Sequence, residues 1–183
     1  NFSITRAIPK SSTLANLKIK CLILRHPNIR KKMTYAEELE YIVSNEKRID
    51  FVVNLLRHLN GNTLCLFQLV EKHGKILNDK MKGSENVYFV YGGTDTSDRE
   101  KIRGLVETHT KSTTIASFGV FSTGINIRNI NNIVLASPSK SKIRVLQSIG
   151  RGLRRSDIKD SILIYDIADD ISYNERRNFT LNH

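Results

Sequence analysis

Apolar residues follow two different periods along the chain, and these periods predict the order of its strands and helices. Six short apolar runs are typical of strands, at residues 17–24, 63–68, 86–91, 113–118, 132–136 and 161–167. Apolar positions at helical spacing predict two helices within 34–60 and further helices at 70–82, 97–108 and 141–153. Strands buried on both faces and joined by helices predict a three-layer α/β/α fold with a mainly parallel sheet.

Polar residues at two predicted helix starts support these boundaries. Thr34 with Glu37 and Ser97 with Glu100 have the spacing of a capping box, and Gly61 ends the second helix. A length of 183 residues suits one domain. We therefore expect one structural domain made of three consecutive parts: a basic N-terminal segment with the first strand (1–33), a helical segment (34–60) and the main α/β region (61–183).

Positive charge is concentrated in two parts of the chain. Lys and Arg number 29 against 18 Asp and Glu, for a formal net charge of +11. Residues 1–33 and 108–156 each contain eight basic and no acidic residues. Clustered cations bind polyanions by displacing counterions from phosphates, which favours nucleic acid as the partner over a merely solvated basic surface. Trp is absent and aromatic residues are few, so base stacking is not the main contact expected.

Several classes of protein and site are disfavoured. No apolar run approaches the ~18 residues of a membrane span, and the N-terminus is not a signal peptide, so we expect a cytoplasmic protein without membrane contact. The chain begins without Met, and we expect it to be part of a longer protein. Cys21 and Cys65 lie in strand-like runs without metal-ligand spacing, so we expect two reduced core residues and no metal site.

Small polar residues and glycines follow the predicted strands. In a parallel sheet, ligands bind beyond the carboxyl ends of the strands, where backbone N–H groups can face phosphate oxygens. Four such segments are candidates for function: residues 68–70, 92–95, 118–126 and 137–139. Asp169-Asp170 also follows a predicted strand, and we interpret it as a helix cap.

Two motifs are more specific than the rest. They are FSTGINI at 121–127 and QSIGRGLRR at 147–155. Here the sequence resembles the second RecA-like domain of superfamily 2 helicases, whose motif V has a Gly-Ile-Asp core and whose motif VI reads Gln-x-x-Gly-Arg-x-x-Arg. The likeness includes LCLFQ (64–68) and YGGTDTSDRE (91–100) and covers about 60–167. It implies a P-loop NTPase-type domain that lacks its own P-loop.

The spacing of motif VI indicates nucleotide chemistry. Arg151 and Arg154 are three residues apart, so on a helix both guanidinium groups can reach one phosphoryl group and act as arginine fingers. The alternative is a basic surface helix, which the two glycines beside Arg151 disfavour. The resemblance implies that Gln147 positions the nucleotide or the attacking water and that Gly150 belongs to the nucleotide site.

Motif V departs from the family pattern. Gly124 and Asn126 are candidates for nucleotide binding, but Asn126 replaces the usual carboxylate by an uncharged amide. The hydroxyl that contacts phosphate stays open among Ser117, Ser122 and Thr123, and each of these can instead be a turn former. The residues expected to contact nucleic acid are Gln68, Lys72, Gly92, Gly93, Thr94, Lys111, Ser117, Ser122 and Thr123.

The chain has no GxxxxGK[ST] loop and no Asp-Glu pair placed to hold Mg²⁺. The resemblance therefore implies the monomeric C-terminal half of an ATP-dependent DNA helicase or branched-DNA translocase, inactive alone. ATP and Mg²⁺ would bind mainly to an N-terminal RecA-like domain of the same protein. DNA substrates would be single-stranded or branched, such as forks, junctions and R-loops, in recombination, repair and replication control. The alternative function is a non-catalytic RecA-like nucleic-acid-binding module.

Overall fold

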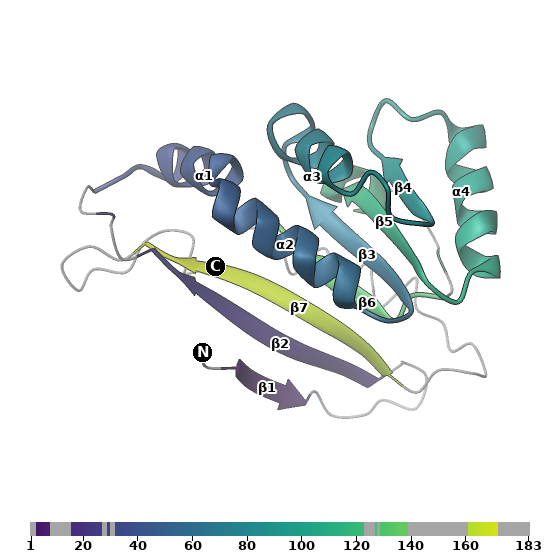
Figure 1. Ribbon diagram of the computed structural model, residues 1–183, viewed down its shortest axis with the longest axis horizontal. Helices are drawn as coiled ribbons and strands as arrows, with labels where there is room; N and C mark the ends of the chain where they lie inside the picture. The colour runs from purple at the N-terminus through teal and green to yellow at the C-terminus, as the bar shows by residue number, and fades with distance from the viewer. Residues whose placement is uncertain are drawn as a thin grey trace.

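One twisted sheet forms the centre of the computed structural model, which describes residues 3–7, 16–26, 29, 32–122, 127, 129–138 and 161–171 (Figure 1). Within these residues the sheet has the order β1-β2-β7-β6-β3-β5-β4. β1 is antiparallel to β2, and all other neighbours are parallel, which confirms the mainly parallel sheet. The strands are β1 (Ser3–Ala7), β2 (Asn16–Arg25), β3 (Asn62–Phe67), β4 (Val87–Val90), β5 (Ser112–Ser117), β6 (Asn132–Leu135) and β7 (Ser161–Asp170).

Helices connect the parallel strands. They are α1 (Tyr35–Ser44), α2 (Glu46–His58), the π-helix η1 (Val70–Gly74), α3 (Lys75–Lys80), α4 (Thr96–Thr108) and α5 (Phe118–Ser122). None of the helices among the described residues is long and apolar enough to cross a membrane. The helix expected at 70–82 consists of the π-helix η1 followed by α3. The helix expected at 141–153 lies outside the described residues.

Two hydrophobic clusters cover the two faces of the sheet. Successive residues of β3 point to opposite faces, so that Leu64 and Leu66 belong to one cluster and Cys65 and Phe67 to the other. α2 and α3 pack on the Cys65 side, in front of the sheet in Figure 1, and α4 and α5 contribute to the Leu64 side. Neither Cys21 nor Cys65 is in a disulfide; Cys65 lies in the core as expected, whereas Cys21 is only half-buried.

Three local expectations have different outcomes. The capping box of Thr34 and Glu37 is confirmed at the start of α1. The box of Ser97 and Glu100 is wrong: Asp95 occupies the N-cap position and α4 begins at Thr96, so that Ser97 lies inside the helix, and Glu100 pairs with Arg103 instead. The interpretation of Asp169-Asp170 as a helix cap is also wrong, because β7 continues through both residues.

The register explains the length of β7. Parallel pairing aligns Asp169 with Leu24 and Asp170 with Arg25, up to the last residue of β2. Because β7 pairs with β2 along its whole length, β7 continues beyond the apolar run at 161–167 as far as Asp170.

A glycine at the end of η1 permits close packing on the sheet. A Cβ added to Gly74 would overlap the ring of Phe67, which is buried and stacked on Phe89. Because that ring cannot move away easily, Gly74→Ala should lower the free energy of unfolding by about 1–3 kcal/mol.

Urea unfolding at equilibrium measures this change. Gly104→Ala is the matched control, since Gly104 lies inside α4 and a Cβ added there would meet no atom within 4 Å apart from its chain neighbours and the backbone of its own helix. Better helix propensity should make the Gly104→Ala chain more stable by up to about 1 kcal/mol. Equal stability changes for the two substitutions would contradict the packing argument.

Candidate functional site

The carboxyl ends of six parallel strands lie along one edge of the sheet, where ligands bind in folds of this class. Gln68 follows β3, Gly92 and Gly93 follow β4, Ser117 ends β5 and Ser137 follows β6. The structure thus brings most of the described candidate residues to a single edge, as the sequence predicts.

Lys111 does not belong to this group. It precedes β5 instead of following a strand, and its Nζ donates to the carbonyl oxygen of Arg57 at 3.2 Å. Its location at the amino edge corrects the expectation that it lies beside the other candidates. Chain direction causes the difference, because residues before and after a strand lie at opposite edges of the sheet.

Gln68 and Lys72 stand near the end of β3. The side chain of Gln68 is exposed, and Nζ of Lys72 lies 2.8 Å from both carboxylate oxygens of Glu40 in α1. Both partners of this ion pair are more than half exposed. Such a pair contributes little to stability, so Lys72 can exchange Glu40 for a phosphate at small cost.

The turn after β4 presents exposed backbone. Thr94 closes it, because its N–H donates to the carbonyl oxygen of Tyr91 at 2.9 Å and its Oγ1 accepts from the Tyr91 N–H at 3.0 Å. Arg99 of α4 donates to the carbonyl oxygen of Gly92 at 3.0 Å. Gly92 and Gly93 themselves are exposed. Arg99 therefore supports the turn from behind and leaves its glycines open to a ligand.

The remaining predicted residues are only partly described. Ser117 is buried at the end of β5, with 8% of its surface exposed, and Ser122 is the last residue of α5. The other members of motifs V and VI lie outside the described residues: Thr123, Gly124, Asn126, Gln147, Gly150, Arg151 and Arg154.

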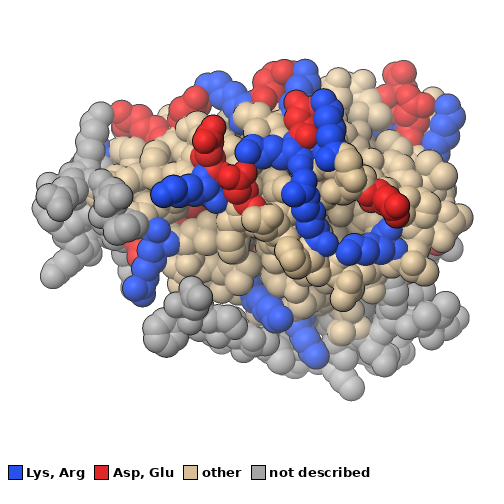
Figure 2. Space-filling model, in the orientation of Figure 1, with Lys and Arg blue, Asp and Glu red and all other residues tan. Residues whose placement is uncertain are grey.

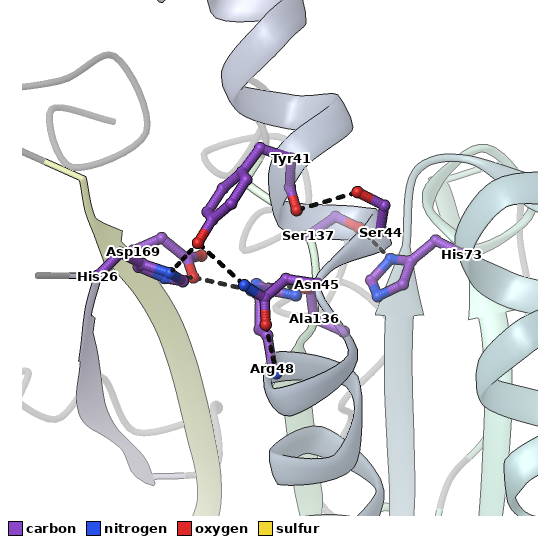
Figure 3. A network of polar contacts seen from close by, with 9 residues as sticks. All are labelled: His26, Tyr41, Ser44, Asn45, Arg48, His73, Ala136, Ser137 and Asp169. Carbon is purple, nitrogen blue, oxygen red and sulfur yellow. Dashed lines mark hydrogen bonds and ion pairs between the residues drawn. The ribbon is translucent and has the colours of Figure 1, made fainter. Parts of the chain in front are cut away.

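A buried ion pair lies at the same carboxyl edge (Figure 3). Nε of Arg48 in α2 donates to Oδ1 of Asp169 at 2.8 Å, and Nη2 donates to the carbonyl oxygen of Ala136 at 2.8 Å. Nε2 of His26 lies 3.0 Å from the same Oδ1. Arg48 and Asp169 are 2% and 0% exposed. One guanidinium group therefore joins α2 to the ends of β7 and β6.

Two further pairs of side chains extend this network, Tyr41 with Asn45 and His73 with Ser137. Oη of Tyr41 lies 3.1 Å from Nδ1 of His26 and accepts from the side-chain amide of Asn45 at 3.0 Å. On the other side, Nδ1 of His73 lies 2.9 Å from Oγ of Ser137. The network therefore runs from the end of β2 to η1 across the carboxyl edge (Figure 3).

Burial sets the protonation of these groups. Desolvation, reinforced by the positive charge of Arg48, lowers the pKa of His73 from 6.5 to about 3, so that its ring is neutral at neutral pH. Burial alone would raise the pKa of Asp169, but the hydrogen bond from His26 and the charge of Arg48 hold it below its ordinary value. Asp169 is therefore a carboxylate engaged by two side chains.

The described residues contain no group of three or more His, Cys, Asp and Glu side chains that could hold a metal ion. Asp169 follows an apolar run as a magnesium ligand often does, but Arg48 and His26 already engage its carboxylate. The described part of the chain therefore does not fit a magnesium site of its own.

Sequence reasoning missed the network residues His26, Arg48, His73 and Asp169. One signal was available, since Arg48 stands within the apolar helical stripe of Ile49, Val52 and Leu56. A charged residue at such a position needs a buried partner.

Comparison with known proteins decides the family. The sequence model for the helicase conserved C-terminal domain matches residues 47–156, more than half of the chain. The chain belongs to this helicase family. The ATP-dependent DNA helicase uvsW of Enterobacteria phage T4 is 36% identical over 173 residues, which cover 90% of this chain and 34% of that protein. The chain thus spans about a third of the length of this relative.

Solved structures agree with the sequence match. The crystal structure of T4 UvsW has a TM-score of 0.78 at 35% identity and covers 91% of this chain and 37% of that chain. The C-terminal part of the Fun30 ATPase domain has a TM-score of 0.57 at 16% identity, over 69% of this chain and 42% of that one, and supports the fold alone. The expected superfamily 2, RecA-like C-terminal domain is confirmed.

In this helicase domain, His73→Gln should reduce the acid sensitivity of folding. The native pKa is about 3, whereas the unfolded chain has the ordinary value of 6.5, so below pH 6.5 only the unfolded state binds this proton. Stability is complete above that pH and falls progressively as the pH drops toward 3. At about pH 5 the loss amounts to about 2 kcal/mol.

Urea unfolding near pH 7.5 and pH 5 measures the effect. Native protein should lose about 2 kcal/mol more than the His73→Gln variant over this interval. His58→Gln is the matched control, because His58 is exposed on α2 and its removal should leave the acid-induced loss intact. An identical loss in native protein and His73→Gln would show that His73 is not held neutral.

Proposed function

We propose that the chain is the C-terminal motor domain of an ATP-dependent DNA helicase or branched-DNA translocase. The observation that carries this proposal is the motif QSIGRGLRR, at the end of a matched family region, in a chain that resembles T4 UvsW over 91% of its length. ATP and Mg²⁺ bind mainly to an N-terminal RecA-like domain of the same protein. The protein acts as a monomer, and the isolated C-terminal domain does not hydrolyse ATP.

The nucleotide site lies between the two RecA-like domains. Arg151 and Arg154 stabilise negative charge on the γ-phosphate in the transition state, and Gln147 positions the nucleotide or the attacking water. Gly124, Asn126 and Gly150 contact the nucleotide. When bound, Mg²⁺ neutralises phosphate charge. Closure on ATP and opening after hydrolysis move one domain relative to the other along a DNA strand.

DNA follows the carboxyl edge of the sheet. The turn at Gly92–Thr94, with its two exposed glycines, and the side chains of Gln68 and Lys72 offer backbone and cationic groups to phosphates. Ser117 at the end of β5 contributes with Ser122 and Thr123, which follow it in the sequence. Contacts to phosphates carry no information about the base sequence, so we expect binding without base preference.

The face with α1, α2 and α3 does not favour DNA. Figure 2 shows Lys and Arg interspersed there with Asp and Glu, and ion pairs such as Lys80 with Asp50 and Lys75 with Glu71 neutralise much of the charge. The acid-free segments 1–33 and 108–156 supply the net attraction instead.

The likeness to the phage helicase suggests the substrates. The proposed substrates are forks, Holliday-type junctions and R-loops, on which a branched-DNA translocase acts in recombination, repair and replication control. We place this activity in the cytoplasm of a host cell. The alternative is a non-catalytic RecA-like module that binds nucleic acid. The presence of Gln147, Gly150, Arg151 and Arg154 favours the motor.

In the protein that contains both RecA-like domains, Arg151→Ala or Arg154→Ala should lower kcat for ATP hydrolysis by roughly 10³-fold or more. The γ-phosphate gains charge only in the transition state, so nucleotide and DNA affinities should change little. Lys at either position should not restore kcat, because it lacks the planar fork of Arg. Steady-state ATPase assays with and without DNA measure this.

Arg103→Ala is a control, since Arg103 forms exposed pairs with Glu100 and Glu107 on α4. It should hydrolyse ATP at the native rate. Normal hydrolysis by both motif VI variants, together with weaker DNA binding, would overturn the assignment and favour the non-catalytic module.

The isolated chain should bind single-stranded DNA weakly, with strong salt dependence and without base preference. If four phosphates are contacted, affinity should fall roughly 50-fold between about 50 and 200 mM salt. Fluorescence anisotropy with labelled strands of different sequence measures this dependence.

Two lysines at opposite edges of the sheet locate the contact surface. Lys72→Ala, at the carboxyl edge, should weaken binding and flatten the salt dependence by about one phosphate contact. Lys111→Ala, at the amino edge, removes the same charge and should have a smaller effect. The opposite ranking would place the DNA at the amino edge.

A further inference from the structure

Two side chains and one backbone N–H, from α2, η1 and the residue after β3, hold the point where the chain leaves β6. Arg48 donates to the carbonyl oxygen of Ala136 at 2.8 Å. The next residue, Ser137, accepts from the backbone N–H of Gln68 at 3.2 Å and lies 2.9 Å from Nδ1 of His73. Arg48, His73 and Ser137 are each at most 2% exposed. The exit from β6 is therefore held in one arrangement by α2, η1 and the end of β3.

The Arg48 guanidinium is itself held from two directions. Its Nε donates to Asp169, so that Nη2 can reach Ala136 only in one orientation of the planar group. The backbone N–H of Arg48 donates to Oδ1 of Asn45, the residue that caps α2. A buried cation with fixed partners is costly to move, because any displacement leaves a charge or a donor unpaired.

The segment after this exit carries the proposed nucleotide chemistry. Gln147 lies ten residues beyond Ser137 in the sequence, followed by Arg151 and Arg154. Charge stabilisation by an arginine finger depends on its position to within a fraction of an ångström, and a displacement of about 1 Å can cost about 100-fold in rate.

We propose that Arg48 and Ser137 are positioning residues for ATP hydrolysis, which fix the start of the segment that carries motif VI. This proposal rests on the proposed function, because it requires Arg151 and Arg154 to act on ATP. Ser137 also connects the exit of β6 to that of β3, so one hydroxyl joins the segment before motif VI to Gln68, a proposed DNA contact.

The first test compares two buried serines in the protein that contains both RecA-like domains. Ser137→Ala should lower kcat for DNA-stimulated ATP hydrolysis by roughly 10- to 100-fold, with KM for ATP and Kd for DNA nearly unchanged. Ser112→Ala is the matched control. Ser112 is 2% exposed and donates from its hydroxyl to Oδ1 of Asn62 at 2.8 Å, at the opposite edge of the sheet. It should keep the native kcat at a similar loss of stability.

The second test compares two arginines that donate to backbone carbonyls. Arg48→Lys keeps the charge beside Asp169 but cannot span both Asp169 and Ala136, so kcat should fall while the protein stays folded. Arg57→Lys is the control, because Arg57 donates to the carbonyl oxygen of Lys80 at 2.7 Å far from the β6 exit. Its kcat should be native. Thermal unfolding establishes that each variant is folded at the assay temperature.

The outcomes separate the inference from the proposed function. Equal changes of kcat in Ser137→Ala and Ser112→Ala, or native kcat in Arg48→Lys, would overturn the positioning role. If Arg154→Ala loses hydrolysis while Ser137→Ala and Arg48→Lys retain it, only this inference fails. If Arg154→Ala hydrolyses ATP normally, the proposed function itself fails. Loss of DNA affinity without loss of kcat in Ser137→Ala would show that the network serves DNA binding instead.

Discussion

The buried pair of Arg48 and Asp169 is the constraint on which the carboxyl edge of this domain depends. A guanidinium group and a carboxylate removed from water must satisfy each other and their remaining hydrogen-bonding groups, since an unpaired charge in the interior costs several kcal/mol. Arg48 meets most of this requirement through Nε with Asp169 and through Nη2 with the carbonyl oxygen of Ala136, while its Nη1 has no hydrogen-bond partner among the described residues, and Asp169 also engages His26. The pair thereby sets α2, β7, β6 and the end of β2 at defined positions around one point.

The two edges of the sheet are built differently. At the amino edge, side-chain amides and a buried serine close the ends of the strands, as Asn62 engages the carbonyl oxygens of Val106 and His109 and accepts from Ser112. At the carboxyl edge the network is buried at the ends of β2, β7 and β6, while Gln68 after β3 and Gly92 and Gly93 after β4 are exposed. A closed edge maintains the fold, whereas a rigid buried network beside open polar groups is suited to hold a ligand. This contrast supports the proposal that nucleotide and DNA bind at the carboxyl edge.

The π-helix after β3 shows how backbone geometry serves this edge. The N–H groups of His73 and Gly74 both donate to the carbonyl oxygen of Leu69, which widens the turn. His73 then reaches Ser137, and Gly74 packs against the ring of Phe67. The turn therefore places a neutral imidazole in the core and Lys72 on the surface, so that one short element joins the buried network to the exposed candidate site.

The sequence by itself determined the strand and helix order, the parallel sheet and the edge at which most candidate residues lie, because hydrophobic periodicity and chain direction are local properties of the chain. Motifs V and VI likewise indicate the family. Only the tertiary structure decided the partners of Arg48 and Asp169, which are 121 residues apart, and the place of His73 beside Ser137, 64 residues away. It also decided the antiparallel pairing of β1 with β2. Pairing of this kind depends on which distant groups share one buried site, and the desolvation cost that enforces it has no periodic signature along the chain.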